Sequence, residues 1–130
     1  FSKVDCAFLV GAGSLGSALL QDKGLSAFGL SIEAAFDVDK AKVGTKVNDI
    51  EIFHIDQFRA MAAERNVVIG IITVPAEHAQ NVADLMVAWG IKAIWNFTPA
   101  RIKVPSHIVV QNTTIYMNLA ILFNKLYNQE

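Results

Sequence analysis

The sequence predicts an α/β fold with a doubly wound, mostly parallel sheet, and three observations support this. Apolar runs of strand length alternate with segments of helical periodicity along the chain of 130 residues. The first apolar run ends directly in a glycine-rich turn at residues 11–16. Finally, 53% of the residues are hydrophobic and 18% are charged, which suits a sheet buried on both faces and excludes a disordered chain.

Six strands are expected, at residues 4–10, 32–36, 50–55, 67–73, 93–97 and 108–111. A helix is predicted after the glycine-rich turn, with Gly24 as its stop, and another from the N-cap Asp56 to Glu64. Behind Pro75, apolar residues at helical spacing predict a third helix that ends at Gly90. The polar segment 37–49 is expected to hold at most one helical turn, and the direction of the last strand stays open.

The C-terminal segment, residues 113–130, is predicted to be a dimerisation helix that follows a nucleotide-binding domain at residues 1–112. Ile115, Leu119 and Leu122 fall on one side of this helix, but Met117 and Phe123 make its other sides apolar as well. A helix buried on one face alone should have a polar back. We therefore expect a second subunit to cover it, in a homodimer; the alternative is a helix lying across its own sheet.

Composition excludes several classes of protein. The net charge is −1, so the chain lacks the basic surplus of a nucleic-acid-binding domain. Its lone cysteine, Cys6, excludes an internal disulfide and is expected to be buried and inert, and the three histidines lack metal-ligand spacing. No apolar run approaches the roughly 18 residues of a membrane span, and no signal peptide is evident. We expect a cytoplasmic protein without a metal site or membrane contact.

The glycine-rich turn matches the pattern G-x-G-x-x-G between a strand and a helix, with an acid about twenty residues further on, as in Rossmann-like dinucleotide-binding folds. Gly11 would permit the tight turn, and Gly13 would leave room for a pyrophosphate. Gly16 would let the helix pack against the strand. Backbone N–H groups of the first helical turn would then hold the phosphates. The alternative is a purely structural turn.

Asp37 ends the second predicted strand, where its carboxylate can accept hydrogen bonds from the ribose hydroxyls of an adenosine. A 2′-phosphate would be repelled there, and no Arg lies between Val38 and Asp49 to offset this, so the predicted cofactor is NAD(H) rather than NADP(H). Asp39 is a second candidate for the ribose, or it caps the following turn.

Two further segments at strand ends, T-V-P-A and N-F-T-P, are expected to line the nicotinamide half of the site; Phe97 could instead be a core aromatic. The predicted cofactor-binding residues are Gly11, Ala12, Gly13, Ser14, Leu15, Gly16, Asp37, Val38, Asp39, Thr73, Val74, Pro75, Ala76, Asn96, Phe97 and Thr98. These segments offer no evident general acid or base, and no second domain remains for a substrate. We therefore predict a non-enzymatic nucleotide-binding domain with no catalytic residues.

The strings GAGSLGSALL, AAFDVDKAKVG, TVPAEHAQ, NFTP and VVQN, in this order and with matching gaps, resemble the nucleotide domain of the Rex family of redox-sensing transcriptional repressors. The resemblance implies a homodimer with an exchanged C-terminal helix that senses the NADH/NAD⁺ ratio. It also implies operator DNA binding through an N-terminal winged-helix domain that is absent from this chain.

The sequence departs from the family at two positions associated with switching, where Asp22 and Thr114 stand in place of a Tyr and an Asp. Two alternatives remain open from the residues themselves. One is a fragment of an NAD-dependent dehydrogenase. The other is the CoA-binding domain of an acyl-CoA ligase, which has less need of an acid such as Asp37.

Overall fold

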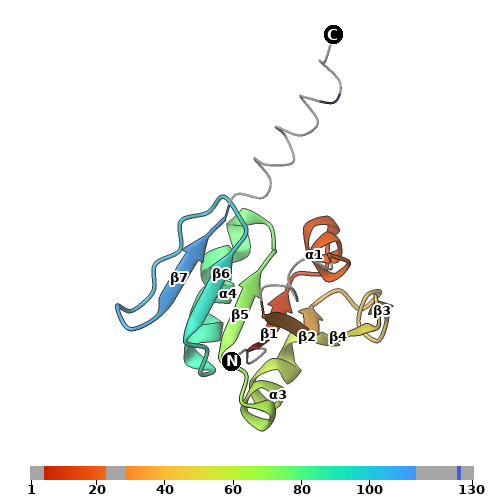
Figure 1. Cartoon of the computed structure of the whole chain (residues 1–130), viewed down its shortest axis with the longest axis horizontal. Helices are drawn as coiled ribbons and strands as arrows, with labels where there is room; N and C mark the ends of the chain where they lie inside the picture. The colour runs from red at the N-terminus through yellow and green to blue at the C-terminus, as the bar shows by residue number, and fades with distance from the viewer. Residues whose placement is uncertain (1–4, 23–28, 114–125, 127–130) are drawn as a thin grey trace.

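The computed structural model describes residues 5–22, 29–113 and 126, which form one seven-stranded sheet in the order β3-β4-β2-β1-β5-β6-β7 (Figure 1). All neighbouring strands pair in parallel except β3 with β4. The chain runs outward from the central β1 to β2 and β4, then returns to β5 and continues to β6 and β7. The predicted doubly wound, mostly parallel sheet is confirmed. The strands are β1 Asp5–Val10, β2 Leu30–Asp37, β3 Lys46–Val47, β4 Ile50–His54, β5 Ile69–Ile72, β6 Ala93–Asn96 and β7 Val109–Asn112.

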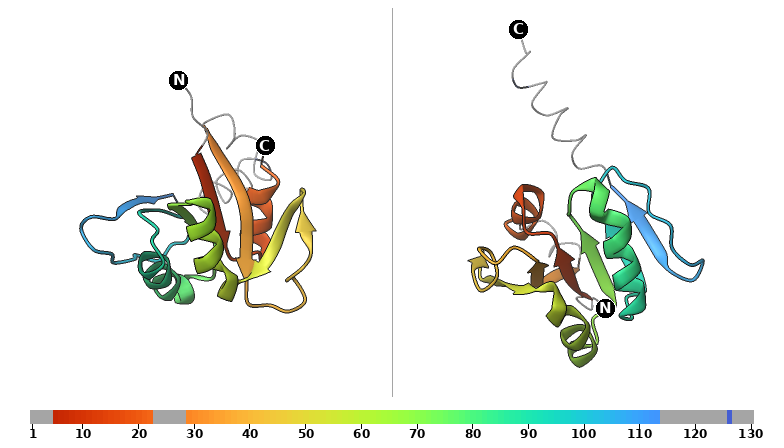
Figure 2. Two further views of the ribbon diagram at one scale, coloured as in Figure 1. Left: turned by 90° about the horizontal axis from the view of Figure 1, so that it is seen from below. Right: turned by 180° about the vertical axis from the view of Figure 1, so that it is seen from behind.

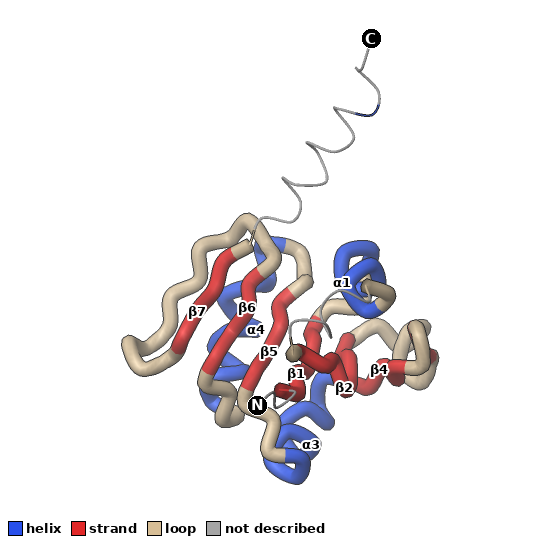
Figure 3. Tube along the Cα trace, in the orientation of Figure 1, coloured by secondary structure: helices blue, strands red, loops and turns tan. Residues whose placement is uncertain are grey.

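The described helices lie on both faces of this sheet, as the views from below and from behind in Figure 2 and the blue segments of Figure 3 show. Helices α3 (Phe58–Arg65) and α4 (Ala76–Ala88) pack on one face, and the short helix α1 (Ser14–Leu20) packs on the other. A single 3₁₀ turn, η1 (Ile55–Gln57), precedes α3. The described core therefore consists of two apolar clusters separated by the sheet.

Successive side chains of β1 point to opposite faces of the sheet, so this strand contributes to both apolar clusters. Phe8 and Val10 point toward α3 and α4, while Ala7 and Leu9 point toward α1. The ring of Phe8 lies 5.0 Å from that of Phe36 and 5.4 Å from that of Phe58, which anchors α3 to the sheet. Because β1 is completely buried from residue 7 onward, the glycine-rich turn starts from a rigid support.

The structure contains one strand that the sequence-based prediction missed. Strand β3 pairs antiparallel with β4 through a tight turn, and both turn residues, Asn48 and Asp49, have positive φ angles of 52° and 65°. Asn and Asp tolerate this left-handed region, so a two-residue hairpin turn forms without glycine. The rest of the polar segment consists of turns, as expected.

The predicted N-cap of the helix after β4 is wrong. Asp56 lies inside η1, and the backbone N–H of Asp56 donates to Nδ1 of His54 at 3.1 Å. The N-cap residue of α3 is Gln57. Phe58 and Ala62 of α3 are buried against the sheet.

Further expectations concern Cys6, the direction of the last strand and the C-terminal helix. Cys6 is exposed rather than buried, because the first two residues of β1 are not covered. Strand β7, whose direction the sequence left open, is parallel to β6. The predicted dimerisation helix lies outside the described residues except for Thr113 and Leu126, and the predicted stop at Gly24 is outside them as well. Within the described part of the chain, no helix has the length and apolarity needed to cross a membrane.

Candidate functional site

The carboxyl ends of β1, β2 and β5 are joined by hydrogen bonds at the point where the direction of winding reverses. The N–H of Gly11 donates to the carbonyl of Phe36 at 2.9 Å, and the hydroxyl of Thr73 donates to the carbonyl of Gly11 at 2.7 Å. Thr73 is buried and its backbone N–H also donates to Val10 at 3.0 Å. In open α/β sheets, ligands bind in the crevice beside such strand ends.

Two of the three motif glycines are required by the local geometry. Gly11 has a φ of +107°, and a Cβ atom on it would lie 2.7 Å from the backbone nitrogen of Val74. A Cβ on Gly16 would lie 1.8 Å from the carbonyl oxygen of Gly11. Gly16 therefore allows α1 to approach the end of β1, as the motif predicts.

Gly13 differs from the other two glycines, because a Cβ placed on it would meet no atom within 4 Å. It is the N-cap residue of α1 and offers no side-chain cap to the first turn, which also contains no acidic residue. The space beside this turn is open, and nothing in the described fold requires a glycine at position 13. A ligand that approaches the backbone closely would require one.

The carboxylate of Asp37 organises the neighbouring backbone. Its Oδ2 accepts a hydrogen bond from the N–H of Ala12 at 2.8 Å. Its Oδ1 accepts from the N–H groups of Val38 at 2.8 Å and Asp39 at 3.0 Å. Asp37 is thus fixed between the glycine-rich turn and the end of β2, and its side chain remains partly exposed to the cavity beside it.

These strand ends open into a cavity of about 410 Å³ that also extends along α4. Half of the residues predicted to bind the cofactor line this cavity: Gly11, Gly13, Asp37, Val38, Asp39, Thr73, Val74 and Pro75. They come from three separate segments of the chain, which the fold brings together as predicted. Their role in binding a cofactor stays a prediction.

Among the other predicted residues, five flank the lining without belonging to it: Ala12, Ser14, Leu15 and Gly16 in or before α1, and Ala76 in α4. The N-F-T-P segment lies elsewhere. Phe97 is buried in the core, 4.7 Å from the ring of Trp95, and Thr98 lines a separate cavity beside Arg101.

Asn96, also predicted to bind cofactor, is fully buried and has an evident structural role. Its Nδ2 donates to the carbonyl of Ala100 at 2.8 Å and to Oδ1 of Asn112 at 3.0 Å. Its Oδ1 accepts from the N–H and the hydroxyl of Thr98. These bonds connect β6, β7 and the turn between them, so the side chain is engaged within the fold.

Sequence reasoning missed the part of the cavity that α4 contributes. The lining residues that sequence reasoning missed are His78, Asn81, Val82 and Leu85 of α4, together with Val10, Lys42 and Ile55. Four of them follow the helical spacing i, i+3, i+4, i+7 from His78, which was the signal available in the sequence. Val82 also belongs to the core cluster on this face of the sheet.

Few of the side chains that line the cavity could act as a general acid, a general base or a metal ligand. His78 is exposed, and its imidazole makes no hydrogen bond to any described residue, so no described carboxylate orients it as a general base. Among the residues that the structure describes, no three His, Cys, Asp or Glu side chains gather as a metal site would require. The described lining offers polar groups that suit ligand binding, but it offers no oriented side chain that could act as a general acid or base.

Comparison with known proteins identifies the family. A family model described as a CoA binding domain matches residues 3–100. The redox-sensing transcriptional repressor Rex of Bacteroides thetaiotaomicron is 58% identical over 126 residues, which make up 97% of this chain and 57% of that protein. The chain therefore spans little more than half the length of this relative.

Solved structures of RSP, a Rex-family repressor, share the fold. The complex of RSP with β-NADH has a TM-score of 0.83 at 31% identity and covers 98% of this chain and 61% of that chain. The complex with β-NAD⁺ and operator DNA has the same TM-score and identity, and 58% of that chain is covered. This chain belongs to the CoA binding domain family and, within it, to the Rossmann domain of the Rex redox-sensing transcriptional repressors.

Proposed function

We propose that this chain is the NAD(H)-binding regulatory domain of a Rex-type redox-sensing repressor. The observation that carries the proposal is the single cavity that joins the open backbone at Gly13 to the carboxylate of Asp37. A dinucleotide needs this pair of features, a backbone concavity for its phosphates and an acceptor for its ribose. The related repressor RSP has been solved with β-NADH and with β-NAD⁺, at 31% identity to this chain.

The proposed role is regulatory and not enzymatic. The relatives are named as transcriptional repressors, and the described cavity offers no histidine paired with an acid. RSP was solved with operator DNA, and this chain has a net charge of −1. We therefore assign operator binding in the whole protein to a winged-helix domain in the part of the relatives that this chain does not match. A repressor of this kind acts in the cytoplasm.

A second ligand class, CoA, is favoured by one observation, the description of the matching family model. CoA shares the adenosine diphosphate portion of NAD(H) but carries an additional phosphate on the ribose. The carboxylates of Asp37 and Asp39 both line the cavity, and they disfavour another anion there. Lys42 lies in the same lining and offsets one of these two charges.

Calorimetric titration of the domain with NADH, NAD⁺, NADPH and CoA tests the assignment. We expect NADH or NAD⁺ to bind, NADPH to bind at least about tenfold more weakly because of charge repulsion at Asp37, and CoA to fail as a competitor. Tight binding of CoA without binding of NADH would overturn the proposal. Reaction of bound NADH with hydroxy-acid, alcohol or aldehyde partners would instead favour a dehydrogenase.

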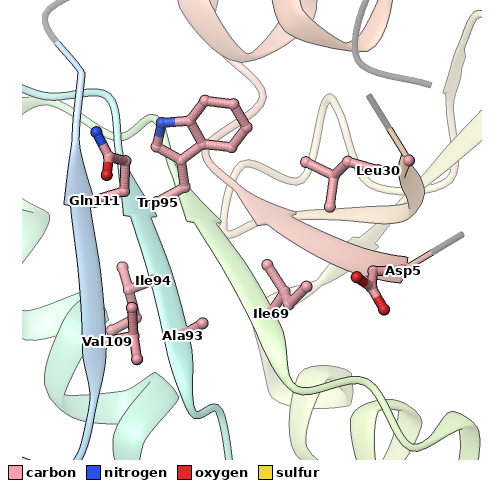
Figure 4. A pocket seen from close by; sticks show the side chains of 9 residues that line it. Asp5, Leu30, Ile69, Ala93, Ile94, Trp95, Val109 and Gln111 are labelled. Carbon is pink, nitrogen blue, oxygen red and sulfur yellow. The ribbon is translucent and has the colours of Figure 1, made fainter. Parts of the chain in front are cut away.

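We further propose that the domain forms a homodimer that involves residues 113–130. The sheet face around Trp95 supports this. It forms a mostly apolar hollow of about 340 Å³ that extends from β7 over β6 and β5 to the first residues of β1 and β2, away from α4 (Figure 4). Val109 in this hollow is 67% exposed. The indole N–H of Trp95 donates to the hydroxyl of Thr113 at 2.8 Å, so the proposed dimerisation segment begins beside this face.

A further inference from the structure

Strands β6 and β7 form one end of the sheet, and a second cavity lies at their carboxyl ends (Figure 1). We call it the β6–β7 cavity. Its volume is about 410 Å³, and it is lined by Thr98, Pro99, Ala100, Arg101, Ile102 and Asn112. None of these residues lines the cavity proposed for the nucleotide, so the two cavities have separate linings.

The β6–β7 cavity has a positive charge that no described carboxylate neutralises. Arg101 alone carries a charge among the residues of its lining. The Arg101 side chain is exposed and makes no hydrogen bond or ion pair to any described residue. The sequence contains no acidic residue between Asp84 and Glu130, whereas Lys92 and Lys103 also fall in this interval. Local charge of one sign attracts ligands of the opposite sign.

The hydrogen bonds of Asn96 determine which atom of Asn112 remains available. The backbone N–H of Thr98 can only donate, so the Asn96 atom that accepts from it at 3.0 Å is Oδ1. Nδ2 of Asn96 must then donate, and it does so to the carbonyl of Ala100 at 2.8 Å and to Oδ1 of Asn112 at 3.0 Å. The Asn112 carboxamide is therefore left with Nδ2, a donor, and no described residue accepts from it.

The segment that carries Arg101 offers further donors and is held in place. The backbone N–H groups of Arg101 and Ile102 make no hydrogen bond to a described residue. The next residue, Lys103, is fixed to α4, since its N–H donates to Oε1 of Gln80 at 2.7 Å and its carbonyl accepts from Nε2 of Gln80 at 2.8 Å. Donors that are held before a ligand arrives lose little conformational entropy on binding.

A positive charge beside available donors, with no charged acceptor in the lining, suits a ligand with several negatively charged oxygens. We propose that the β6–β7 cavity binds a small oxyanion, a carboxylate or a phosphate group, through the guanidinium of Arg101 and Nδ2 of Asn112. The planar guanidinium matches two oxygens of either group. This site lies outside the lining of the nucleotide cavity, so the inference goes beyond the proposed function and does not depend on it.

Titration of the full chain with sodium phosphate and, separately, with sodium acetate tests the proposal. Sodium chloride at matched ionic strength is the reference, because it reproduces general screening. The NMR signals of the Arg101 side-chain N–H, the Asn112 carboxamide and the backbone amides of Arg101 and Ile102 report binding at this cavity. Each titration is repeated with saturating NADH, because free phosphate is also expected to bind beside Gly13.

Two variants remove the proposed ligand contacts, and a third is the matched control. Arg101→Gln removes the charge and keeps a polar side chain. Asn112→Asp keeps an oxygen that accepts from Asn96 but replaces the Nδ2 donor with a second oxygen. The control, Lys103→Gln, removes a cation two residues from Arg101 and outside the lining. Arg101→Gln and Lys103→Gln should both leave the affinity for NADH unchanged.

We expect the unchanged chain to give saturable shifts, with a dissociation constant of about 1 mM or lower for the better of the two anions. Arg101→Gln and Asn112→Asp should each weaken this binding by about tenfold or more, since both remove a hydrogen bond to a charged group. Lys103→Gln should bind as the unchanged chain does. Tighter binding of phosphate assigns a phosphoryl group to the ligand, and tighter binding of acetate assigns a carboxylate; either result supports the site.

Three results would overturn the proposal. In the first, neither anion gives a saturable shift beyond that of chloride. In the second, Lys103→Gln weakens binding as much as Arg101→Gln, so that general charge and not this cavity explains the attraction. In the third, saturating NADH abolishes the shifts, which would place the anion in the nucleotide cavity. A chain that fails to bind NADH but retains the shifts contradicts only the proposed function.

Discussion

The carboxylate of Asp37 accepts a hydrogen bond of 2.8 Å from the backbone N–H of Ala12, across 25 positions of the sequence. This bond holds the glycine-rich turn against the end of β2. The acid that the motif assigns to the ribose therefore also positions the backbone proposed to hold the phosphates. Loss of its charge should disturb both halves of the proposed site at once.

Asp37→Ala should weaken NADH binding by about thirtyfold or more. The substitution removes an ionised acceptor, and hydrogen bonds to charged groups contribute roughly 1.5–3 kcal/mol each. Asp39→Ala is the comparison within the same cavity and should cost less affinity, because Asp39 is exposed and, among the described residues, its carboxylate accepts only from the N–H of Ala41. Calorimetry on the two variants checks this. Equal losses at both positions would contradict the special role of Asp37.

Gly13→Ala should weaken NADH binding by about tenfold or more while leaving the domain folded. The added methyl group meets no protein atom within 4 Å, so the fold tolerates it at a cost of about 1 kcal/mol for a poorer N-cap. The same methyl group would occupy the space proposed for the pyrophosphate. Thermal melting and calorimetry measure the two effects separately, and unchanged affinity would argue against phosphate binding at this turn.

Gly16→Ala, in contrast to Gly13→Ala, should destabilise the fold. Its Cβ would lie 1.8 Å from the carbonyl oxygen of Gly11, so α1 must move away from β1. Overpacking against backbone costs about 3 kcal/mol or more, and chemical denaturation would measure it as a lower free energy of unfolding. A variant as stable as the unchanged domain would show that this contact is not close in solution.

Asn96→Ala should lower the free energy of unfolding by about 2–4 kcal/mol. The side chain is fully buried and its partners on Ala100 and Thr98 would be left without hydrogen bonds. The affinity of the remaining folded domain for NADH should change little, since Asn96 lies outside the cavity lining. Normal stability combined with lost affinity would instead support the direct cofactor contact predicted from the sequence.

A chain that ends before Thr113 should be monomeric or aggregate. The sheet face beside Trp95 would then stay uncovered, and exposed apolar surface of this kind promotes non-specific association. Light scattering of the full and the shortened chain checks the prediction. A stable, well-behaved dimer of the shortened chain would contradict the proposed role of residues 113–130.

The strand–helix alternation and the meeting of three segments at the cavity could be predicted because buried strands and the glycine motif have strong patterns. Strand β3 could not, since it has two residues and depends on a turn that Asn48 and Asp49 form without glycine. Asp56 was misassigned because the nearby imidazole of His54 accepts its backbone N–H and starts a 3₁₀ turn first.

The side of the cavity formed by α4 was missed for a different reason. Val82 serves both the core and the cavity, and periodicity marks only its core role. His78 lies within the string TVPAEHAQ, but the pattern gives it no binding role, and Asn81 matches no motif. Only the placement of α4 beside the end of β2 shows that both line the cavity. Likewise, the burial of Asn96 depends on contacts with β7 that the local sequence does not specify.

The central claim is that one nucleotide lies with its phosphates against Gly13 and its adenosine ribose at Asp37. A crystal structure of the domain soaked with NADH measures this directly. The account predicts density for the pyrophosphate beside the first turn of α1, with a ribose hydroxyl within hydrogen-bond distance of the Asp37 carboxylate. An empty cavity at saturating NADH, or a nucleotide bound elsewhere on the sheet, would contradict it.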